Sequence, residues 1–224
     1  MQDTLTQLAQ HHRDSKKFVQ KIKETAETRF GLEFWKAWDI HIVPVLSEQP
    51  KIADFGCGPG MLLEYLRDRY SQAELIGVEY APYMLEELDS SRYQVIEHDL
   101  NKANLPIADN SLDAITSIFC IHEMIQPIRL LQSIHRCLKP GGRCLLIDWE
   151  RESLESYVAE QTTDDLFDNN ISDETLGDIF THFMEHNRYT FNDLLWLFEQ
   201  TGFTVLENRR FQKDRFRRWS IMAS

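Results

Sequence analysis

The chain has 224 residues, of which 42% are hydrophobic and 11% aromatic, enough for one well-buried core but too few for two full domains. Its formal net charge of −12 opposes binding to a phosphate backbone, so we expect no nucleic-acid partner. No apolar run approaches the ~20 residues of a membrane span, and the polar N-terminus lacks the apolar segment of a secretory signal. We therefore expect a soluble, cytoplasmic protein, either a monomer or a homodimer.

The first fifty residues are predicted to be helical. They are rich in Lys, Glu, Gln and Ala, and Phe34, Trp35, Trp38 and Ile42 then recur near the helical period. Two or three helices are expected, the last ending near Pro44. We interpret residues 1–50 as an N-terminal helical cap on a domain that covers residues 51–224.

From residue 51 onward, short β-rich runs alternate with segments long enough for helices. The runs are KIADF, AELIGVEY, YQVIEHD, LDAITSIF and GRCLLIDW. This alternation predicts an α/β fold with a doubly wound, mostly parallel sheet and helices on both faces. Residues 150–189 break the rhythm and are predicted to be a helical insertion. Beyond it we expect one capped helix (TFNDLLWLFEQTGF) and a C-terminal antiparallel hairpin, which makes seven strands.

A glycine turn follows the first strand in the stretch IADFGCGPG. Gly56, Gly58 and Gly60 give GxGxG, and Met61 stands where the dinucleotide fingerprint GxGxxG needs its third glycine. Such a turn at the carboxyl end of a parallel strand brings the backbone and a helix N-terminus close to a nucleotide-like ligand. Glu79 ends the next strand, where a carboxylate accepts hydrogen bonds from ribose hydroxyls. The pattern favours an adenosine ligand without a pyrophosphate.

Five motifs in order resemble the class I S-adenosylmethionine-dependent methyltransferases, from about residue 50 to residue 223. They are IADFGCGPG, GVEYAPYML, EHDL, LDAITSIFCIHEM and SIHRCLKPGGRCLLIDW. The resemblance implies a Rossmann-like seven-stranded fold, S-adenosylmethionine as cofactor and methyl transfer to a small-molecule acceptor. One departure is Glu79, because the family usually has Asp at the end of the second strand.

The same resemblance implies a set of cofactor-binding residues. The glycine turn, braced by Asp54, would surround the methionine and ribose parts, and Glu79 would hold the ribose. Residues after the second and third strands would enclose the adenine, and Phe119 would border the sulfonium. The full set is Asp54, Gly56, Cys57, Gly58, Gly60, Glu79, Tyr80, Met84, Asp99, Leu100 and Phe119.

Two residues after the fourth strand, His122 and Glu123, are the candidate catalytic residues. A general base is needed only if the acceptor must lose a proton, and histidine suits proton removal near neutral pH. The alternative is that His122 merely begins a helix, where it caps or packs.

Histidines of the insertion raise the question of a metal. His182 and His186 lie four apart on one helical face, which suits a divalent metal, but the sequence identifies no third ligand. We therefore predict no metal site. Either one of the two reaches the acceptor pocket, or both are ordinary helix positions.

The insertion is also acidic and is expected to cover the acceptor together with the N-terminal helices. Residues 152–178 contain nine acidic residues and no Lys or Arg, which favours a cationic or amine acceptor unless this is simply a solvated helix face. Trp35, Trp38 and Tyr157 are candidates for the apolar walls of the pocket, or else for core positions.

Two other functions stay open at this point. One is a cofactor-binding protein that assembles partners without catalysis, and the other is a methyltransferase that acts on RNA or protein. Basic residues of the hairpin would contact RNA in the second case, although charges that discourage edge pairing explain them equally well. These residues are Arg209, Arg210, Lys213, Arg215, Arg217 and Arg218.

Overall fold

The computed structural model describes residues 3–162, 165–186, 189–211 and 216–223, apart from the side chains at positions 160, 161, 186 and 211. The strands are β1 (Lys51–Phe55), β2 (Glu74–Glu79), β3 (Gln94–Glu97), β4 (Leu112–Ile118), β5 (Leu138–Trp149), β6 (Phe203–Phe211) and β7 (Phe216–Ala223). The helices are α1 (Thr4–His12), α2 (Ser15–Arg29), α3 (Leu32–His41), α4 (Met61–Arg69), α5 (Pro82–Leu85), α6 (Pro127–Cys137), α7 (Leu154–Gln161), α8 (Asp173–His186) and α9 (Phe191–Gln200), with the 3₁₀ turns η1 (Val43–Val45) and η2 (Ile121–Glu123).

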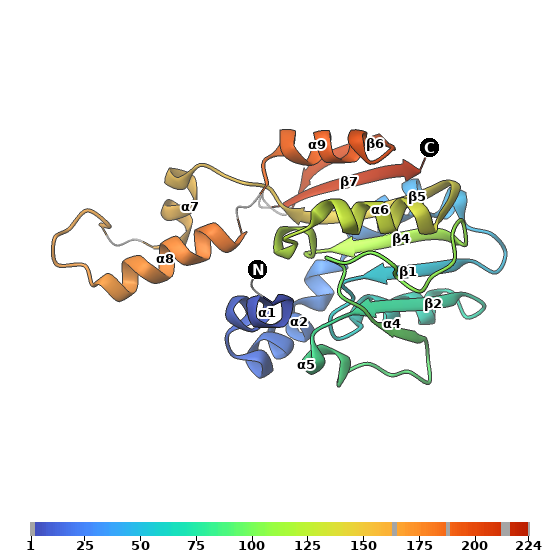
Figure 1. Ribbon diagram of the computed structural model, residues 1–224, viewed down its shortest axis with the longest axis horizontal. Coiled ribbons are helices and arrows are strands. Elements are labelled where there is room, and N and C mark those ends of the chain that lie inside the picture. Colours follow the sequence, from blue (N-terminus) through green and yellow to red (C-terminus); the bar gives the residue numbers. More distant parts are fainter. Residues whose placement is uncertain (1–2, 163–164, 187–188, 212–215, 224) are drawn as a thin grey trace.

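All seven strands form one sheet in the order β3-β2-β1-β4-β5-β7-β6 (Figure 1). Strands β1 to β5 pair in parallel, whereas β7 lies antiparallel between β5 and β6. The predicted doubly wound, mostly parallel sheet with a C-terminal antiparallel hairpin is therefore confirmed.

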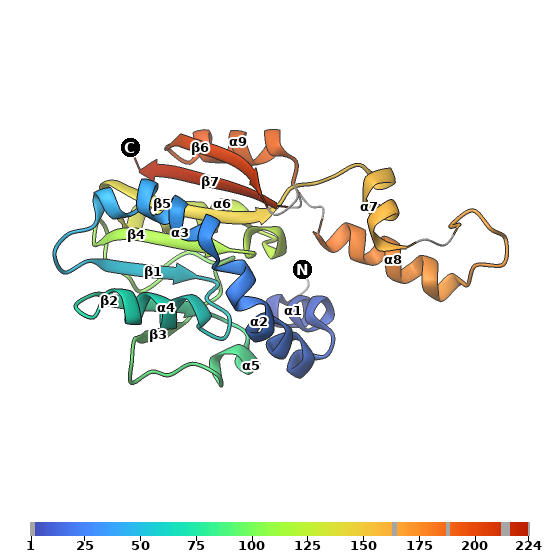
Figure 2. The ribbon, with the colours of Figure 1, turned by 180° about the vertical axis from the view of Figure 1, so that it is seen from behind.

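Helices cover both faces of the sheet. Leu131 and Ile134 of α6 and Phe198 of α9 are fully buried in the core on one face. On the other face α3 and α4 pack against the same strands, as the view from behind shows (Figure 2). The predicted cap of α9 is present, because the Thr190 hydroxyl and the Asp193 carboxylate each accept from the other residue's backbone N–H. Each face is thus closed by amphipathic helices that the sequence pattern indicates.

The N-terminal segment divides into two parts with different roles. Phe34, Trp38 and Ile42 of the α3 region are fully buried in one cluster with Ile52 of β1. The Trp38 Nε1–H also donates to the Tyr70 hydroxyl at 2.8 Å. By contrast, α1 and α2 lie across the carboxyl ends of the strands (Figure 1). Helix α3 therefore belongs to the core of the sheet, and the domain boundary at residue 50 stays a prediction.

The predicted insertion is helical and projects away from the sheet. Helices α7 and α8 pack on each other and extend beyond the body of the fold (Figures 1 and 2). The C-terminal half of α8 returns toward α1 and η2, where Glu185 Oε2 lies 3.7 Å from His11 Nδ1. In the described part of the chain, every helix is too short or too polar to cross a bilayer.

We predict that Trp38→Ala lowers the free energy of unfolding by about 3–5 kcal/mol, because it leaves a cavity in the sheet core. Trp196→Ala is the matched control, since that indole is 57% exposed whereas Trp38 is fully buried, and it should cost less than about 0.5 kcal/mol. Urea unfolding followed by circular dichroism measures both. Equal losses in the two variants would mean that α3 is a detachable cap and not part of the core.

Candidate active site

A cavity of about 430 Å³ lies at the carboxyl ends of β1, β2 and β4. Its floor comes from the glycine turn and the strand ends, and its roof comes from α1 and α2, including Leu8, Phe18 and Ile22. The volume is within the ~300–1,000 Å³ of typical ligand pockets. Every predicted cofactor and catalytic residue lines this cavity except Gly60.

The glycine turn has the backbone geometry that its sequence predicts. Gly56 and Gly60 have φ of +76° and +79°, in the left-handed region that favours glycine. A Cβ at Gly56 would lie 2.6 Å from the Cys120 sulfur, and one at Gly60 would lie 2.5 Å from the Tyr93 hydroxyl. Gly60 does not line the cavity because it is the N-cap of α4. Its part is to shape the turn.

Glu79 ties the end of β2 to the glycine turn. Its carboxylate accepts from the backbone N–H groups of Gly58 at 2.9 Å, Tyr80 at 2.7 Å and Ala81 at 2.9 Å. Burial raises the pKa of Glu79, and these three donors act in the opposite direction. A carboxylate has about four acceptor positions, so Glu79 keeps room for a ligand hydroxyl while it fixes the turn.

Asp54 stands behind the turn and is almost fully buried. The Thr116 hydroxyl donates to its carboxylate at 2.6 Å. Burial raises the pKa of Asp54 to about 7, although the hydrogen bond from Thr116 favours the ionised form. Asp54 therefore braces the turn from the core side.

The wall after β2 and β3 has the residues expected around an adenine. Met84 and Leu100 are buried at the cavity. The Asp99 carboxylate accepts from the Asn101 backbone N–H at 3.0 Å and from the Thr4 hydroxyl at 2.9 Å. Beside it, His98 Nε2 is buried with no hydrogen-bond partner among the described residues. A buried nitrogen of this kind is suited to a ligand atom, and His98 was not among the residues predicted from the sequence, although EHDL contains it.

A half-buried cation lines the cavity from the roof. Arg29, at the end of α2, lines the cavity, and its guanidinium carbon lies 4.7 Å from the centroid of the Phe119 ring. Burial lowers the pKa of Arg29 to about 10. Among the described residues it donates to Thr25 and forms no ion pair. Arg29 is therefore suited to an anionic group of a ligand, although the sequence did not predict it as a site residue.

His122 is held by two contacts with one carboxylate. Its Nδ1 lies 2.6 Å from Asp148 Oδ1, and its backbone N–H donates to Asp148 Oδ2 at 3.3 Å. Asp148 is buried near the end of β5, next to the fourth strand. Asp148 was not among the predicted site residues, although an acid at the carboxyl end of a buried strand is a signal for such a role.

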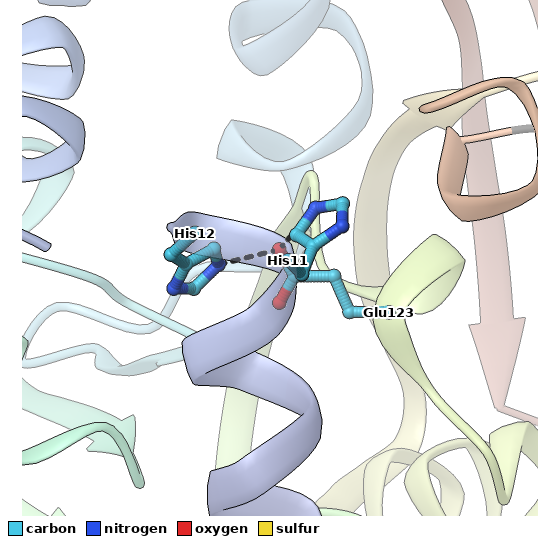
Figure 3. Close-up of side chains that lie close together, drawn as sticks. All are labelled: His11, His12 and Glu123. Atoms are coloured by element: carbon cyan, nitrogen blue, oxygen red, sulfur yellow. Dashed lines mark hydrogen bonds and ion pairs between the residues drawn. The ribbon is translucent and has the colours of Figure 1, made fainter. Parts of the chain in front are cut away.

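Glu123 is surrounded by imidazoles from two distant parts of the chain. Its Oε1 lies 2.9 Å from His12 Nε2 and 3.3 Å from His11 Nε2 (Figure 3). His122 Nε2 lies 3.8 Å from the same oxygen. Burial opposes ionisation of Glu123, but the hydrogen bonds from His11 and His12 outweigh it, so the pKa is well below its usual range. Neither of these two histidines was a candidate from sequence.

The insertion borders the cavity without entering its wall, and its role as a lid stays a prediction. Phe180 and Met184 of α8 line a neighbouring hollow that shares Leu8, His11 and Glu123 with the cavity. No described residue between 150 and 189 lines the cavity. His182 pairs with the Tyr157 hydroxyl between α7 and α8, and the side chain of His186 lies outside the described residues. The acidity of this segment therefore gives no support to a cationic acceptor.

Of the two alternatives for Trp35, Trp38 and Tyr157, packing in the core holds and lining the pocket does not. Trp38 is in the core and Trp35 packs against it. Neither of these nor Tyr157 lines the cavity. The aromatic residues that do are Phe18, Phe30, Tyr80, Phe119, Trp149 and Phe216. Their distance from one another in the sequence explains why no helical spacing indicated them.

Together, the sheet order, the glycine turn and the acidic end of β2 define a Rossmann-like protein that binds a nucleoside. The sequence matches the family described as Methyltransferase domain over residues 5–208, and the chain belongs to this family. This chain thus carries a methyltransferase domain of the kind that uses S-adenosylmethionine as cofactor.

Two relatives illustrate the range of the family. Probable tRNA methyltransferase 9B of Bos taurus is 32% identical over 152 residues, which cover 65% of this chain and 32% of that protein. The ubiquinone/menaquinone biosynthesis C-methyltransferase UbiE of Desulfotalea psychrophila is 32% identical over 101 residues, which cover 44% of this chain and 41% of that protein. The chain thus spans less than half the length of either relative.

Solved structures share the fold. An S-adenosylmethionine-dependent methyltransferase from Aquifex aeolicus has a TM-score of 0.67 at 18% identity, with 94% of this chain and 99% of that chain covered. A phosphoethanolamine N-methyltransferase from Haemonchus contortus, in complex with S-adenosylhomocysteine, has a TM-score of 0.64 at 15% identity, with 99% and 59% covered.

We predict that Glu79→Ala weakens binding of S-adenosylhomocysteine about 5- to 150-fold, or about 1–3 kcal/mol, because it removes a ribose acceptor and the anchor of the glycine turn. Glu97→Ala is the control, since Glu97 pairs with Glu79 in register on β3 but is exposed. Calorimetry measures both affinities. If the folded Glu79 variant binds as tightly as the control, the ribose is held elsewhere.

Proposed function

We propose that the protein methylates a small molecule that binds under α1 and α2, between the glycine turn and His122. The observation that carries this proposal is that one cavity reaches from the predicted nucleoside wall to His122, which Asp148 holds from behind. Cofactor and acceptor would therefore share one enclosed volume, as in-line transfer requires.

The residues that line the cavity are suited to bind the ribose, methionine and adenine parts of S-adenosylmethionine. Glu79 would accept from a ribose hydroxyl, Arg29 would pair with the carboxylate of the methionine part, and Asp99 and His98 would face the adenine. When bound, S-adenosylmethionine supplies a methyl group whose carbon–sulfur bond breaks as the acceptor atom bonds to that carbon. The roof helices would exclude water from this space.

The part of the cavity near His122 is suited to an acceptor that has an apolar body and one ionisable oxygen or nitrogen. Phe216 packs edge-on against Phe119, with ring centroids 4.6 Å apart, and against Trp149 at 4.4 Å, which gives the cavity an apolar wall. If His122 donates its Nδ1–H to Asp148, its Nε2 is the atom that accepts the acceptor's proton. Asp148 then stabilises the imidazolium that forms.

RNA is the second candidate acceptor, and the comparisons run against our expectation of no nucleic-acid partner. Relatives named as tRNA methyltransferases align with up to 65% of this chain. The charges of the hairpin favour the small molecule, because Arg210 and Arg217 pair with Glu150, and Arg218 pairs with Glu207. Lys213 and Arg215 lie outside the described residues.

The acceptor class is tested with S-adenosylmethionine that carries an isotope-labelled methyl group. Phenols, amines, quinone precursors and tRNA transcripts are supplied in turn, and the product is identified by mass. Labelling of a small molecule supports the proposal. Labelling of tRNA alone would replace it with the RNA alternative.

We predict that His122→Gln lowers kcat about 10²- to 10⁴-fold with that acceptor, because proton removal by a positioned base contributes this much. Asp148→Asn should act in the same direction, since it removes the acceptor for the Nδ1–H. His135→Gln is the control, because His135 on α6 does not line the cavity. If His122→Gln retains full kcat while the acceptor loses a proton, another group is the base.

A further inference from the structure

We propose that His11, His12 and Glu123 bind a divalent metal ion of the zinc class at the acceptor end of the cavity. The three donor atoms all lie within 4.8 Å of one another (Figure 3). Zinc–nitrogen and zinc–oxygen bonds of about 2.0–2.1 Å place tetrahedral donors roughly 3.3 Å apart. Glu123 Oε1 lies 3.3 Å from His11 Nε2 and 2.9 Å from His12 Nε2, close to that value, and the donor atoms of the two histidines lie within 4.8 Å of each other.

The opposite nitrogens of these imidazoles contact oxygen atoms. His12 Nδ1 bonds to the Tyr83 hydroxyl, and His11 Nδ1 lies 3.7 Å from Glu185 Oε2. Metal-ligating histidines usually have their second nitrogen on a carboxylate, a carbonyl or water, which fixes the ring orientation. The hydrogen bond to Tyr83 fixes the His12 ring, and the Nε2 atoms of both rings lie on the side of the same carboxylate oxygen, where one ion would reach all three donors.

Burial and donor type point to the same class of ion. The exposed fractions of the side chains are 8% for His11, 5% for His12 and 14% for Glu123. Two imidazoles and one carboxylate form the donor set of catalytic zinc sites that leave a fourth position open. Soft metals prefer sulfur, and Ca²⁺ and Mg²⁺ prefer oxygen, so neither class suits this set.

The open coordination position of the metal would lie beside the proposed base, His122. His122 Nε2 lies 3.8 Å from Glu123 Oε1, so an acceptor oxygen on the metal would lie beside the proposed base. A bound metal favours the deprotonated form of such an oxygen. A metal site here therefore favours an acceptor whose methylated atom is a hydroxyl oxygen. This inference about the acceptor rests on the proposed function, whereas the metal site itself does not.

Metal binding is tested on the full chain with Co²⁺ alone, after chelator treatment and without an acceptor. We expect one equivalent of Co²⁺ to give the visible absorption of a four-coordinate ion, and Zn²⁺ to displace it. Glu123→Ala and His11→Ala should each weaken binding at least about tenfold, the loss typical even of outer partners. His182→Ala is the control, since it removes a histidine outside the cluster.

Binding of S-adenosylhomocysteine by the same samples separates two failures. Each variant that still binds it is folded, so a loss of Co²⁺ affinity then reports on the site. If the wild type binds S-adenosylhomocysteine but gives no Co²⁺ spectrum, or if Glu123→Ala binds Co²⁺ as tightly as the wild type, the cluster is only an ion-pair network. Either result overturns the metal site and leaves the proposed function standing. A wild type that does not bind S-adenosylhomocysteine would instead count against the proposed cofactor site.

Discussion

The carboxylate of Glu123 holds the roof of the cavity to the sheet. Glu123 follows β4, and its partners His11 and His12 lie at the end of α1. One carboxylate therefore links α1 in the roof to the end of a central strand. Two further polar contacts hold α1 in place. The Gln7 side chain donates to the Glu123 carbonyl at 3.1 Å, and the Thr4 hydroxyl donates to Asp99. Burying this carboxylate is tolerable only because imidazoles pair with it.

Apolar packing contributes less to the roof than to the sheet. The cluster beneath α1 and α2 contains only Leu8, Val19, Ala81 and Met84 as buried members, whereas the two sheet faces have much larger cores. Segments with few buried apolar contacts open at lower free energy than the core. The roof is therefore the part of the molecule suited to open for ligand entry and close over both substrates.

The cofactor half was predictable from sequence because its signals are local. Three glycines within five residues and an acid at the end of the next strand each fix a conformation or a bond near their own position, and the sheet brings them together. The acceptor half depends on contacts across the chain. His12 and Glu123 are 111 positions apart, and neighbouring residues on a helix do not normally face one side. A search for helical spacing found His182 and His186 and passed over the pair at the end of α1.

The insertion shows a second limit of sequence reasoning. Its composition correctly indicated helices, but nothing in its residues says in which direction a segment between β5 and α9 projects. It extends from the body, and the aromatic walls come instead from strand ends and α2 (Figure 1). Asp148, in contrast, lies at a strand end, where acids commonly contribute to a site. The signal for it is local and is present in LLIDW.

Hydrogen exchange of the backbone, with and without S-adenosylhomocysteine, tests most directly whether α1 and α2 close over the cofactor. The account predicts slower exchange in α1, in α2 and at the glycine turn when the ligand is added, with α7 and the distal half of α8 unchanged. Protection confined to the glycine turn and the end of β2, with α1 and α2 exchanging at the same rate in both samples, would contradict it.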